Sequence, residues 1–338
     1  MDYRNENRKK IGLCILAVLL TICFLLLSAR IFQIVDQYFG KLEQTGDDAY
    51  AYQYGGRPRY LINGKWYTQK SQLETYLLIG VDKYESAILV DNGYRNHQQS
   101  DALFLLTVDR KKGAYSLIHI NRDTMANIRM LDVGGNPYGD FVGQLALSHT
   151  FGSGSNDSCL NTVWSVSDFL YGLQIDHYIS ITMDAVEMLN DRIGGVTVTV
   201  PEDMTPVNEM LTEGAEVTLR GELSLAYLRA RSQLADSTNL GRMKRQRQYV
   251  EAFLDQAKQA IAEDSTLAYE MVDEIGDYLV SDLSGQELLA FADIIDDYQF
   301  GGIQTIEGEA RIGERFMEFY ADEQALQELV LSTFYEEK

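Results

Sequence analysis

The chain has 338 residues, of which 46% are hydrophobic and only four are proline, and its formal net charge is -21 at pH 7. This composition predicts a globular protein with one sizeable core or two smaller ones, and it argues against extensive disorder. The negative charge excludes nucleic acid as a general partner, because an acidic domain repels the phosphate backbone.

Cysteine and histidine indicate neither a disulfide framework nor a zinc site. Cys14 and Cys23 lie in an uncharged run near the N-terminus, so only Cys159 belongs to the rest of the chain. That part of the chain cannot form an internal disulfide and must be stabilised by its core. The four histidines show no metal-ligand spacing, and no Cys-x-x-Cys motif occurs.

The first predicted element is a membrane anchor. Residues 11–29, IGLCILAVLLTICFLLLSA, contain no charge and are just long enough as a helix to span a hydrocarbon core about 30 Å thick. A cleaved signal peptide is the alternative, but the run is long for one and no small-x-small cleavage site follows. Because the basic residues 8–10 precede the run and only Arg30 follows closely, the positive-inside rule predicts a single-pass protein of the cell membrane. Residues 1–10 would then be cytoplasmic and the C-terminal domain extracytoplasmic.

Two further regions follow the predicted anchor. Residues 30–70 are polar with dispersed aromatic side chains, which predicts a stalk or linker with room for one short hairpin. Residues 71–338 are predicted to form one extracytoplasmic domain with a helical C-terminal part. Strands are expected at 75–81, 102–108, 114–120, 177–183 and 194–201. The turn sequence DRKKG joins the second and third strands, which predicts an antiparallel pair.

Helices are expected between these strands and after Arg231. The sequence predicts them at 160–171, 184–193, 243–261, 267–278, 285–298 and 322–335. Asp184 is the expected N-cap of the second helix, and Gly194 and Gly195 are its stop. Strands alternating with helices predict an α/β fold, a layered α/β/α domain with a central mixed, partly antiparallel sheet.

Three short segments place acidic or basic side chains at strand ends. Asp82 ends a strand in IGVD, Asp101 precedes one in QSDALFLL, and Arg122 and Asp123 follow one in INRDTM. An aspartate at a strand end is more often a turn former or a helix cap than a ligand. Each of these segments is therefore a weak signal by itself.

A basic run is the stronger signal, with seven cations against two acids between residues 220 and 247. Arg229 and Arg231 point to one face of an extended chain, and Arg242, Arg245 and Gln246 share one face of a helix. Two guanidinium groups about 6 Å apart repel by roughly 3 kcal/mol at an effective dielectric of 20, so converging arginines need an anion between them. Phosphate fits the arginine fork and a helix N-terminus, so this run predicts a phosphate site.

The same helix carries two more cations. Lys244 and Arg247 are rotated away from the predicted inward face by the 100° step per residue, so both are expected to face solvent. The alternative to a phosphate site is a solvated basic helix face, the usual explanation of a charge run.

The order and wording of these segments resemble the LytR-CpsA-Psr family of extracytoplasmic enzymes. The likeness covers about residues 75 to 248 and is carried by LLIGVD, SDALFLLTVD, INRDT, GLQIDHYISITMDAVEMLNDRIGGVTVTVP, LRGELSLAYLRAR and GRMKRQ. The resemblance implies a membrane-anchored transferase of cell-wall biogenesis. Such an enzyme moves a phosphoglycosyl polymer (teichoic acid, capsule or another glycan) from a polyprenyl-pyrophosphate carrier to peptidoglycan, with Mg²⁺ or Mn²⁺ as cofactor.

The resemblance also implies roles for individual positions. Asp82 and Asp101 are similar to the family's metal carboxylates. The residues that hold the pyrophosphate and the leaving group are implied to be Arg122, Arg229, Arg231, Arg242, Arg245 and Gln246. Asp123 resembles the acid beside the first of these arginines, and the implied catalytic residues are Arg122, Asp123, Arg242 and Arg245. Phosphoryl transfer needs this kind of charge neutralisation on the attacking and leaving oxygens.

Two positions depart from the family pattern. Gln99 stands where the family usually has arginine, and Gln144 stands where lysine is expected. The loop between Asp82 and Asp101 is also lengthened, and Arg95 within it could replace the missing charge. The missing cations keep open a scaffold that binds polyprenyl pyrophosphate without turnover. A membrane-anchored envelope regulator is a third, separate alternative.

Overall fold

The computed structural model describes residues 59–62, 64–83, 88–90, 93–96, 98–236, 238–314 and 316–337. The predicted cytoplasmic segment, the predicted anchor and most of the predicted stalk lie outside the described residues. Within the described ranges, no helix is both long enough and apolar enough to cross a bilayer. Thr68–Glu337 form one compact unit, and the described residues before it belong to a separate unit.

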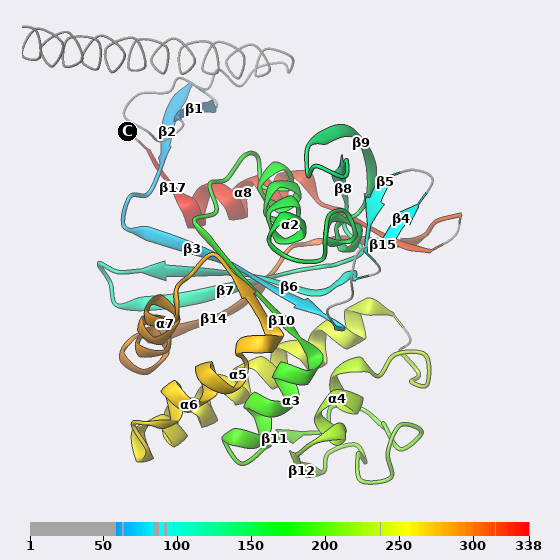
Figure 1. Cartoon of the computed structure of the whole chain (residues 1–338), viewed down its shortest axis with the longest axis vertical. Coiled ribbons are helices and arrows are strands. Elements are labelled where there is room, and N and C mark those ends of the chain that lie inside the picture. The colour runs from blue at the N-terminus through cyan, green and yellow to red at the C-terminus, as the bar shows by residue number, and fades with distance from the viewer. Residues whose placement is uncertain are drawn as a thin grey trace, which may run out of the picture. The chain divides into compact units, whose positions relative to one another are not determined.

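A six-stranded sheet is the centre of the larger unit (Figure 1). Its strands, in spatial order, are β13 (Leu279–Ser281), β10 (His177–Thr182), β3 (Leu73–Val81), β6 (Ser100–Asp109), β7 (Ala114–Ile120) and β14 (Gln299–Thr305). The β10–β3 and β7–β14 pairs are parallel, whereas the other three pairs are antiparallel. The predicted central mixed sheet and the predicted β6–β7 hairpin are confirmed.

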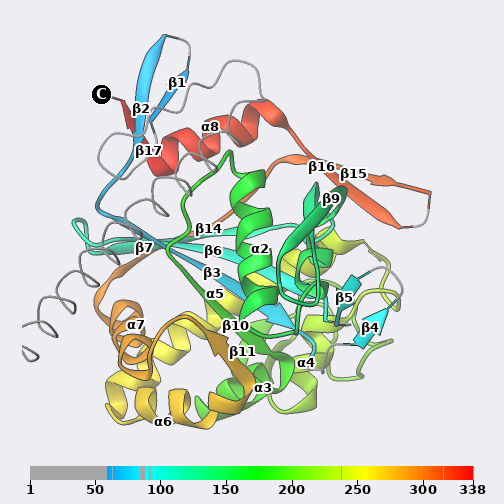
Figure 2. The same cartoon turned by 45° about the horizontal axis from the view of Figure 1, so that its top comes forward.

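The central strands are apolar on both faces because helices cover both sides. Figures 1 and 2 show α2 (Asn156–Phe169) and α8 (Glu323–Phe334) on one side and α5 (Asn239–Glu263) on the other. Leu77 and Leu105 are completely buried, and burying a side chain of this size stabilises a fold by about 1.5–3 kcal/mol. The layered α/β/α arrangement is confirmed.

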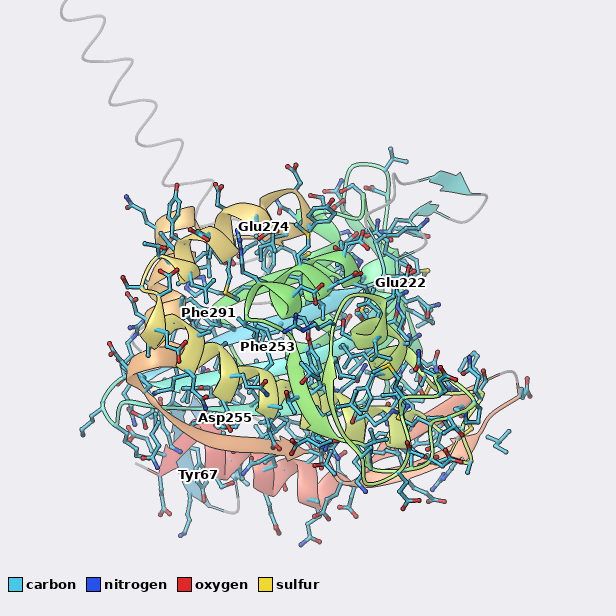
Figure 3. The ribbon with its side chains drawn as sticks, turned by 90° about the horizontal axis from the view of Figure 1, so that it is seen from below. Tyr67, Glu222, Phe253, Asp255, Glu274 and Phe291 are labelled. Atoms are coloured by element: carbon cyan, nitrogen blue, oxygen red, sulfur yellow. The ribbon has the colours of Figure 1, made fainter. Side chains whose placement is uncertain are left out.

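The layer beneath the sheet contains α5, α6 (Leu267–Glu274) and α7 (Gly285–Asp297). Phe291 of α7 packs against the sheet cluster that contains Tyr76 and Phe104. Phe253 of α5 packs against a second core cluster, which includes Tyr227 (Figure 3). Helix α5 therefore connects two cores, because Val250 packs against both.

The second core is built by elements outside the central sheet. They are α3 (Met183–Arg192), β11 (Val196–Thr199), β12 (Glu216–Leu219) and α4 (Glu222–Arg229). Thr182, not Asp184 as predicted, caps α3, since its side chain accepts from Ala185 N at 3.3 Å. The helix ends at Arg192, and the predicted stop, Gly194 and Gly195, follows its C-cap Ile193. There φ is 88° and 89°, a left-handed conformation that glycine adopts without strain.

The remaining strands form short ribbons and edges. They are β1 (Arg59–Ile62), β2 (Lys65–Gln69), β4 (Ile88–Val90), β5 (Gly93–Arg95), β8 (Met125–Leu131), β9 (Pro137–Gln144), β15 (Gly308–Ile312), β16 (Met317–Ala321) and β17 (Tyr335–Glu337). The sequence analysis did not predict the β8–β9 and β15–β16 ribbons or the edge strand β14. Figure 2 shows β15–β16 beside β8–β9, and a bridge between Thr124 and Phe319 joins the two regions.

Candidate functional site

Most of the predicted site residues gather at one edge of the central sheet. Strands β3 and β7 end at this edge and β6 begins there, and ligands often bind at such strand ends in α/β folds. Gly80 pairs with Ala102 whereas Val81 pairs with Ser100, so Asp101 is the extra residue of a bulge. A bulge re-aims the side chain that it carries. It brings Asp101 beside the end of β3, where Asp82 follows directly.

Asp101 is held between two arginines. Nη1 of Arg122, the second residue after β7, forms an ion pair with Oδ1 of Asp101. Nη1 of Arg242, in the first turn of α5, lies 3.9 Å from the same oxygen. Both arginine side chains are largely buried, with 13% and 11% of their surfaces exposed. Two arginines from distant parts of the sequence therefore converge on one carboxylate.

The arginine cluster carries more positive charge than its neighbours neutralise. The pKa of Arg122 is lowered to about 10. Burial is the largest cause, the charges of Arg242 and Arg231 add to it, and the charge of Asp123 opposes it. Nε of Arg122 is buried and lies 3.6 Å from Asp123 Oδ1. Among the described residues it has no hydrogen-bond acceptor. Desolvated cations with an unpaired donor form a binding site for an anion.

Burial in the same cluster shifts the pKa of Asp123 in the opposite direction from that of Arg122. Burial raises its pKa, while Arg122, Arg231 and Arg242 each lower it. Its Oδ1 accepts a hydrogen bond from Gln144 Nε2 at 2.9 Å. Asp123 is thus buried beside Arg122 and orients that arginine.

Two asparagines that the sequence analysis missed position Arg242. Asn239, the first residue of α5, accepts from Arg242 Nε at 3.0 Å and from Nη2 at 2.6 Å, both through Oδ1. Its Nδ2 donates to Oδ1 of Asn121, the residue before Arg122, at 2.6 Å. Their only sequence signal is an asparagine near the arginine in both INRDT and TNLGRMKRQ. The pair joins the two arginine-bearing segments.

Two more of the predicted phosphate arginines come from α4 and the residues after it. Arg229 ends α4 and forms an ion pair with Asp82, and both side chains are exposed, at 50% and 58%. Arg231 follows the helix, and its charge lowers the pKa values of Arg122 and Arg242. Arg231 therefore belongs to the central cluster, whereas Arg229 and Asp82 form its solvent-exposed rim.

Arg245 shares a helix face with Arg242 but is held by protein groups. Its side chain is 1% exposed, Nη1 lies 2.6 Å from Glu202 Oε1, and Nη2 donates to the carbonyl oxygen of Ala230. Ala230 precedes Arg231, so Arg245 positions the backbone from which Arg231 projects. Direct contact of Arg245 with phosphate remains a prediction. Gln246 is partly buried, and within the described ranges no hydrogen bond joins it to the cluster.

The two cations expected to face solvent differ from each other. Lys244 is exposed, as predicted. The prediction is wrong for Arg247, which is partly buried and lines a cavity of about 750 Å³. Leu240, Met243 and Arg247 follow one face of α5 at three- and four-residue steps, and that face looks into the cavity.

Both departures from the family pattern lie on the cluster. Oε1 of Gln99 accepts a hydrogen bond from Arg122 Nη2. Gln144 donates to Asp123 and, at 2.7 Å, to the carbonyl oxygen of Met317. Neutral amides therefore stand at both positions and keep the hydrogen bonding without the charge. The side chain of Arg95 lies outside the described part of the structure.

The carboxylates suit a divalent ion that is shared with a phosphate. Among the described residues, no group of three or more His, Cys, Asp or Glu side chains could hold a metal alone. Mg²⁺ is commonly bound by one or two carboxylates together with substrate phosphates and water. Asp82 and Asp101 provide two carboxylates at adjacent strand ends, and this donor set fits such an ion.

Comparison with known proteins assigns the chain to a family whose profile spans these site residues. The profile of the LytR_cpsA_psr family matches residues 38–332. The chain belongs to the LytR-CpsA-Psr family. The match includes every site residue described above and extends past them to α8, which the resemblance in sequence did not reach.

Curated relatives within the family have names that describe polymer transfer or regulation. The polyisoprenyl-teichoic acid–peptidoglycan teichoic acid transferase TagU of Halalkalibacterium halodurans is 32% identical over 208 residues, 61% of this chain and 60% of that protein. TagT of Bacillus subtilis is 32% identical over 218 residues, 62% of this chain and 59% of that protein. Biofilm regulatory protein A of Streptococcus mutans is 28% identical over 204 residues, 58% and 46% of the two chains. The match spans about three-fifths of the two transferases.

Solved structures share the fold. The structure described as "TagT bound to LIIa-WTA" has a TM-score of 0.59 at 22% identity and covers 78% of this chain and 89% of that one. The crystal structure of Bacillus subtilis TagV has a TM-score of 0.57 at 23% identity, with 78% and 96% covered. At 22% and 23% identity, the likeness shows that this chain shares their fold.

Proposed function

We propose that this protein is a membrane-anchored transferase of cell-wall assembly. It moves a phosphoglycosyl polymer from a polyprenyl-pyrophosphate carrier to peptidoglycan. The observation that carries the proposal is the convergence of buried Arg122 and Arg242 with Arg231, together with the buried Nε of Arg122, which has no hydrogen-bond acceptor among the described residues. A pyrophosphate supplies the missing negative charge, and the names of the family relatives support the substrate class.

Each side chain has a definite part in this proposal. Arg122 and Arg242 hold oxygens of the pyrophosphate and stabilise the charge that develops during phosphoryl transfer. Asp123 and the asparagine pair fix the directions of these two guanidinium groups. Arg245 supports Arg231 through the Ala230 carbonyl. Binding of the substrate must compete with the Asp101 carboxylate, which pairs with Arg122 in this structure.

We propose Asp82 and Asp101 as the residues that hold Mg²⁺ or Mn²⁺. The ion supplies Lewis-acid stabilisation of the phosphate oxygens. With an ion bound, Asp82 and Asp101 would be its carboxylate ligands, and Arg229 and Arg122, which pair with them in this structure, would be available to phosphate. The lengthened loop does not separate the two carboxylates along the sheet, because the bulge places them at adjacent strand ends.

The membrane and the lipid carrier enter the proposal through other parts of the chain. Residues 11–29 are proposed as the single-pass anchor, with the larger unit outside the cell membrane. The polyprenyl tail is proposed to lie along apolar side chains between the sheet and the helices beneath it. Val250, Leu254 and Phe291 are partly buried in that layer and support this placement.

The direct test incubates the purified full chain in detergent with a labelled polyprenyl-pyrophosphate-linked polymer, with and without peptidoglycan and Mg²⁺. We expect label on peptidoglycan only when all components are present. Asp82→Asn and Asp101→Asn should each weaken the Mg²⁺ dependence of geranyl pyrophosphate binding, measured by calorimetry. Asp273→Asn, at an exposed position on α6, is the matched control. Unchanged Mg²⁺ dependence in both site variants would refute the metal assignment.

A scaffold without turnover is the second candidate, and one observation favours it. Gln144 places an amide, not a cation, against Asp123. If Gln144 limits the chemistry, Gln144→Lys should raise the transfer rate without tightening donor binding. If the wild-type chain binds the donor, leaves peptidoglycan unlabelled and gains transfer through Gln144→Lys, the scaffold is the correct function.

A further inference from the structure

A cavity of about 750 Å³ lies next to the arginine cluster and has no part in holding the pyrophosphate. It is bounded by the first three turns of α5, the end of β14 and the residues that follow it, and the β15–β16 ribbon. Its volume lies within the roughly 300–1,000 Å³ typical of ligand pockets. Most of its walls come from the part of the chain after residue 300, where the sequence analysis singled out no site.

The cavity and the arginine cluster share a wall. Asn121 lines the cavity and, through Asn239, also fixes the direction of Arg242. Strand β16 is attached to the catalytic segment, because Phe319 N donates to the Asp123 carbonyl oxygen at 2.9 Å. A ligand in this cavity therefore lies next to the proposed phosphate position.

The lining excludes the two ligand classes already assigned to the protein. Three carboxylates, Glu307, Glu309 and Asp322, face two guanidinium groups, Arg247 and Arg311, so a polyanion such as pyrophosphate is disfavoured. The same charged groups disfavour an apolar polyprenyl tail, because hydrocarbon cannot replace the water that solvates them. The occupant must be polar and close to neutral.

The lining chemistry fits a carbohydrate. Sugar hydroxyls donate to carboxylates, and the apolar face of a pyranose ring packs on an aromatic ring such as that of Tyr320, which is 39% exposed. Two of these carboxylates have protein partners: Glu309 accepts from Arg311 at 2.8 Å in an exposed ion pair, and Asp322 accepts from Ala325 N at 2.9 Å. Each of these carboxylates retains a second oxygen for a ligand.

Strands β15 and β16 pack closely where they form one wall of the cavity. A Cβ on Gly308 would lie 2.3 Å from the carbonyl oxygen of Tyr320 and 2.7 Å from the ring of Phe319. Glycine at this position therefore allows β15 to pack directly against Phe319 and Tyr320, two of the β16 residues that line the cavity. The wall is a paired strand, which holds its side chains more firmly than a loop does.

We propose that this cavity is the acceptor subsite and binds N-acetylhexosamine units of the peptidoglycan glycan. The assignment rests on the proposed function. With the glycan in the cavity, one of its hydroxyl oxygens forms a bond to the phosphorus nearest the donor polymer. The bond from that phosphorus to the lipid phosphate breaks, and the lipid leaves as a monophosphate. The hydroxyl proton passes to the departing phosphate or to water.

The test measures saccharide binding directly, without turnover. Chitotetraose, a neutral N-acetylglucosamine tetramer, is titrated into the full chain in detergent by calorimetry. Tyr320→Ala and Glu309→Gln should each weaken its binding at least fivefold and leave geranyl pyrophosphate binding within twofold of wild type. Tyr269→Ala, at a tyrosine that is 61% exposed on α6, should change neither value. Tyr320→Phe keeps the ring and should bind chitotetraose like wild type, which separates packing on the ring from loss of the ribbon.

Three results would overturn the proposal. The first is a wild-type chain that does not bind chitotetraose. The second is equal weakening by Tyr320→Ala and Tyr269→Ala. The third is displacement of chitotetraose by farnesyl-pyrophosphate-linked N-acetylglucosamine but not by geranyl pyrophosphate, which would assign the cavity to the donor sugar. A chain that binds chitotetraose in this cavity but transfers no polymer would instead refute the proposed function and leave the saccharide site standing.

Discussion

Two arginine–aspartate pairs lie at the same edge of the sheet and differ in their exposure to water. In the Arg122–Asp101 pair the side chains are 13% and 35% exposed, whereas in the Arg229–Asp82 pair they are 50% and 58% exposed. Burial strengthens each interaction of the inner pair with a ligand, because little water screens it. Solvent screens the outer pair, and exposed ion pairs contribute about 0–1 kcal/mol. Residues with the same expected role should thus contribute very different binding energies.

Removal of a buried arginine should have the largest effect on donor binding. Each hydrogen bond between an inner arginine and a phosphate should contribute about 1.5–3 kcal/mol. We therefore expect Arg242→Ala to raise the dissociation constant of geranyl pyrophosphate by about ten- to a hundredfold. Arg192→Ala, on α3 and paired with Glu270 and Glu274, is the control and should leave the constant unchanged. Equal effects of both changes would mean that only net charge matters.

Arg245→Ala should affect folding before binding. The change leaves Glu202 and the Ala230 carbonyl without their partner. Leaving buried polar groups unpaired costs about 1–3 kcal/mol, so the free energy of unfolding should fall by this amount in a denaturant titration. Relief of charge repulsion would instead stabilise the protein without ligand. An increase in stability would show that Arg245 is a strained ligand group and not a support.

The exposed pair should respond weakly. We expect Arg229→Ala to weaken geranyl pyrophosphate binding less than about fivefold, in line with the small energies of exposed ion pairs. Raising the salt concentration from 0.05 to about 0.5 M should abolish that difference, because the Debye length falls below the separation of exposed charges. A loss as large as that of Arg242→Ala, persistent at high salt, would place Arg229 in the inner cluster when the donor is bound.

The smallest effect is expected at Lys244. This side chain is exposed on α5, and Lys244→Ala should change both donor and chitotetraose binding less than about twofold. Arg247, three residues along the same helix, lines the cavity, so Arg247→Ala should weaken chitotetraose binding at least threefold and leave donor binding within twofold. The reverse pattern would mean that Arg247 serves the phosphate and not the saccharide.

The sequence by itself determined much of the fold and its family. Short runs rich in β-branched and other apolar residues predicted β3, β6, β7 and β10, because such runs are typical of strands buried on both faces. Periodicity and glycine stops predicted most of the helices, and motif order indicated the family that the profile match confirms. The predicted anchor, metal and lipid carrier rest on the sequence and its resemblance to this family.

Only the tertiary structure decided which role each arginine of the same helix has. Arg242, Arg245 and Arg247 lie on one helix, but long-range contacts determine whether each meets an aspartate, a carbonyl oxygen or a cavity. Strand β14 pairs with β7 across more than 180 residues of chain, and no local pattern encodes that pairing. The saccharide cavity depends on this pairing and on the β15–β16 ribbon. Burial and partner choice are properties of segments brought together by folding, so a linear pattern of charges does not determine them.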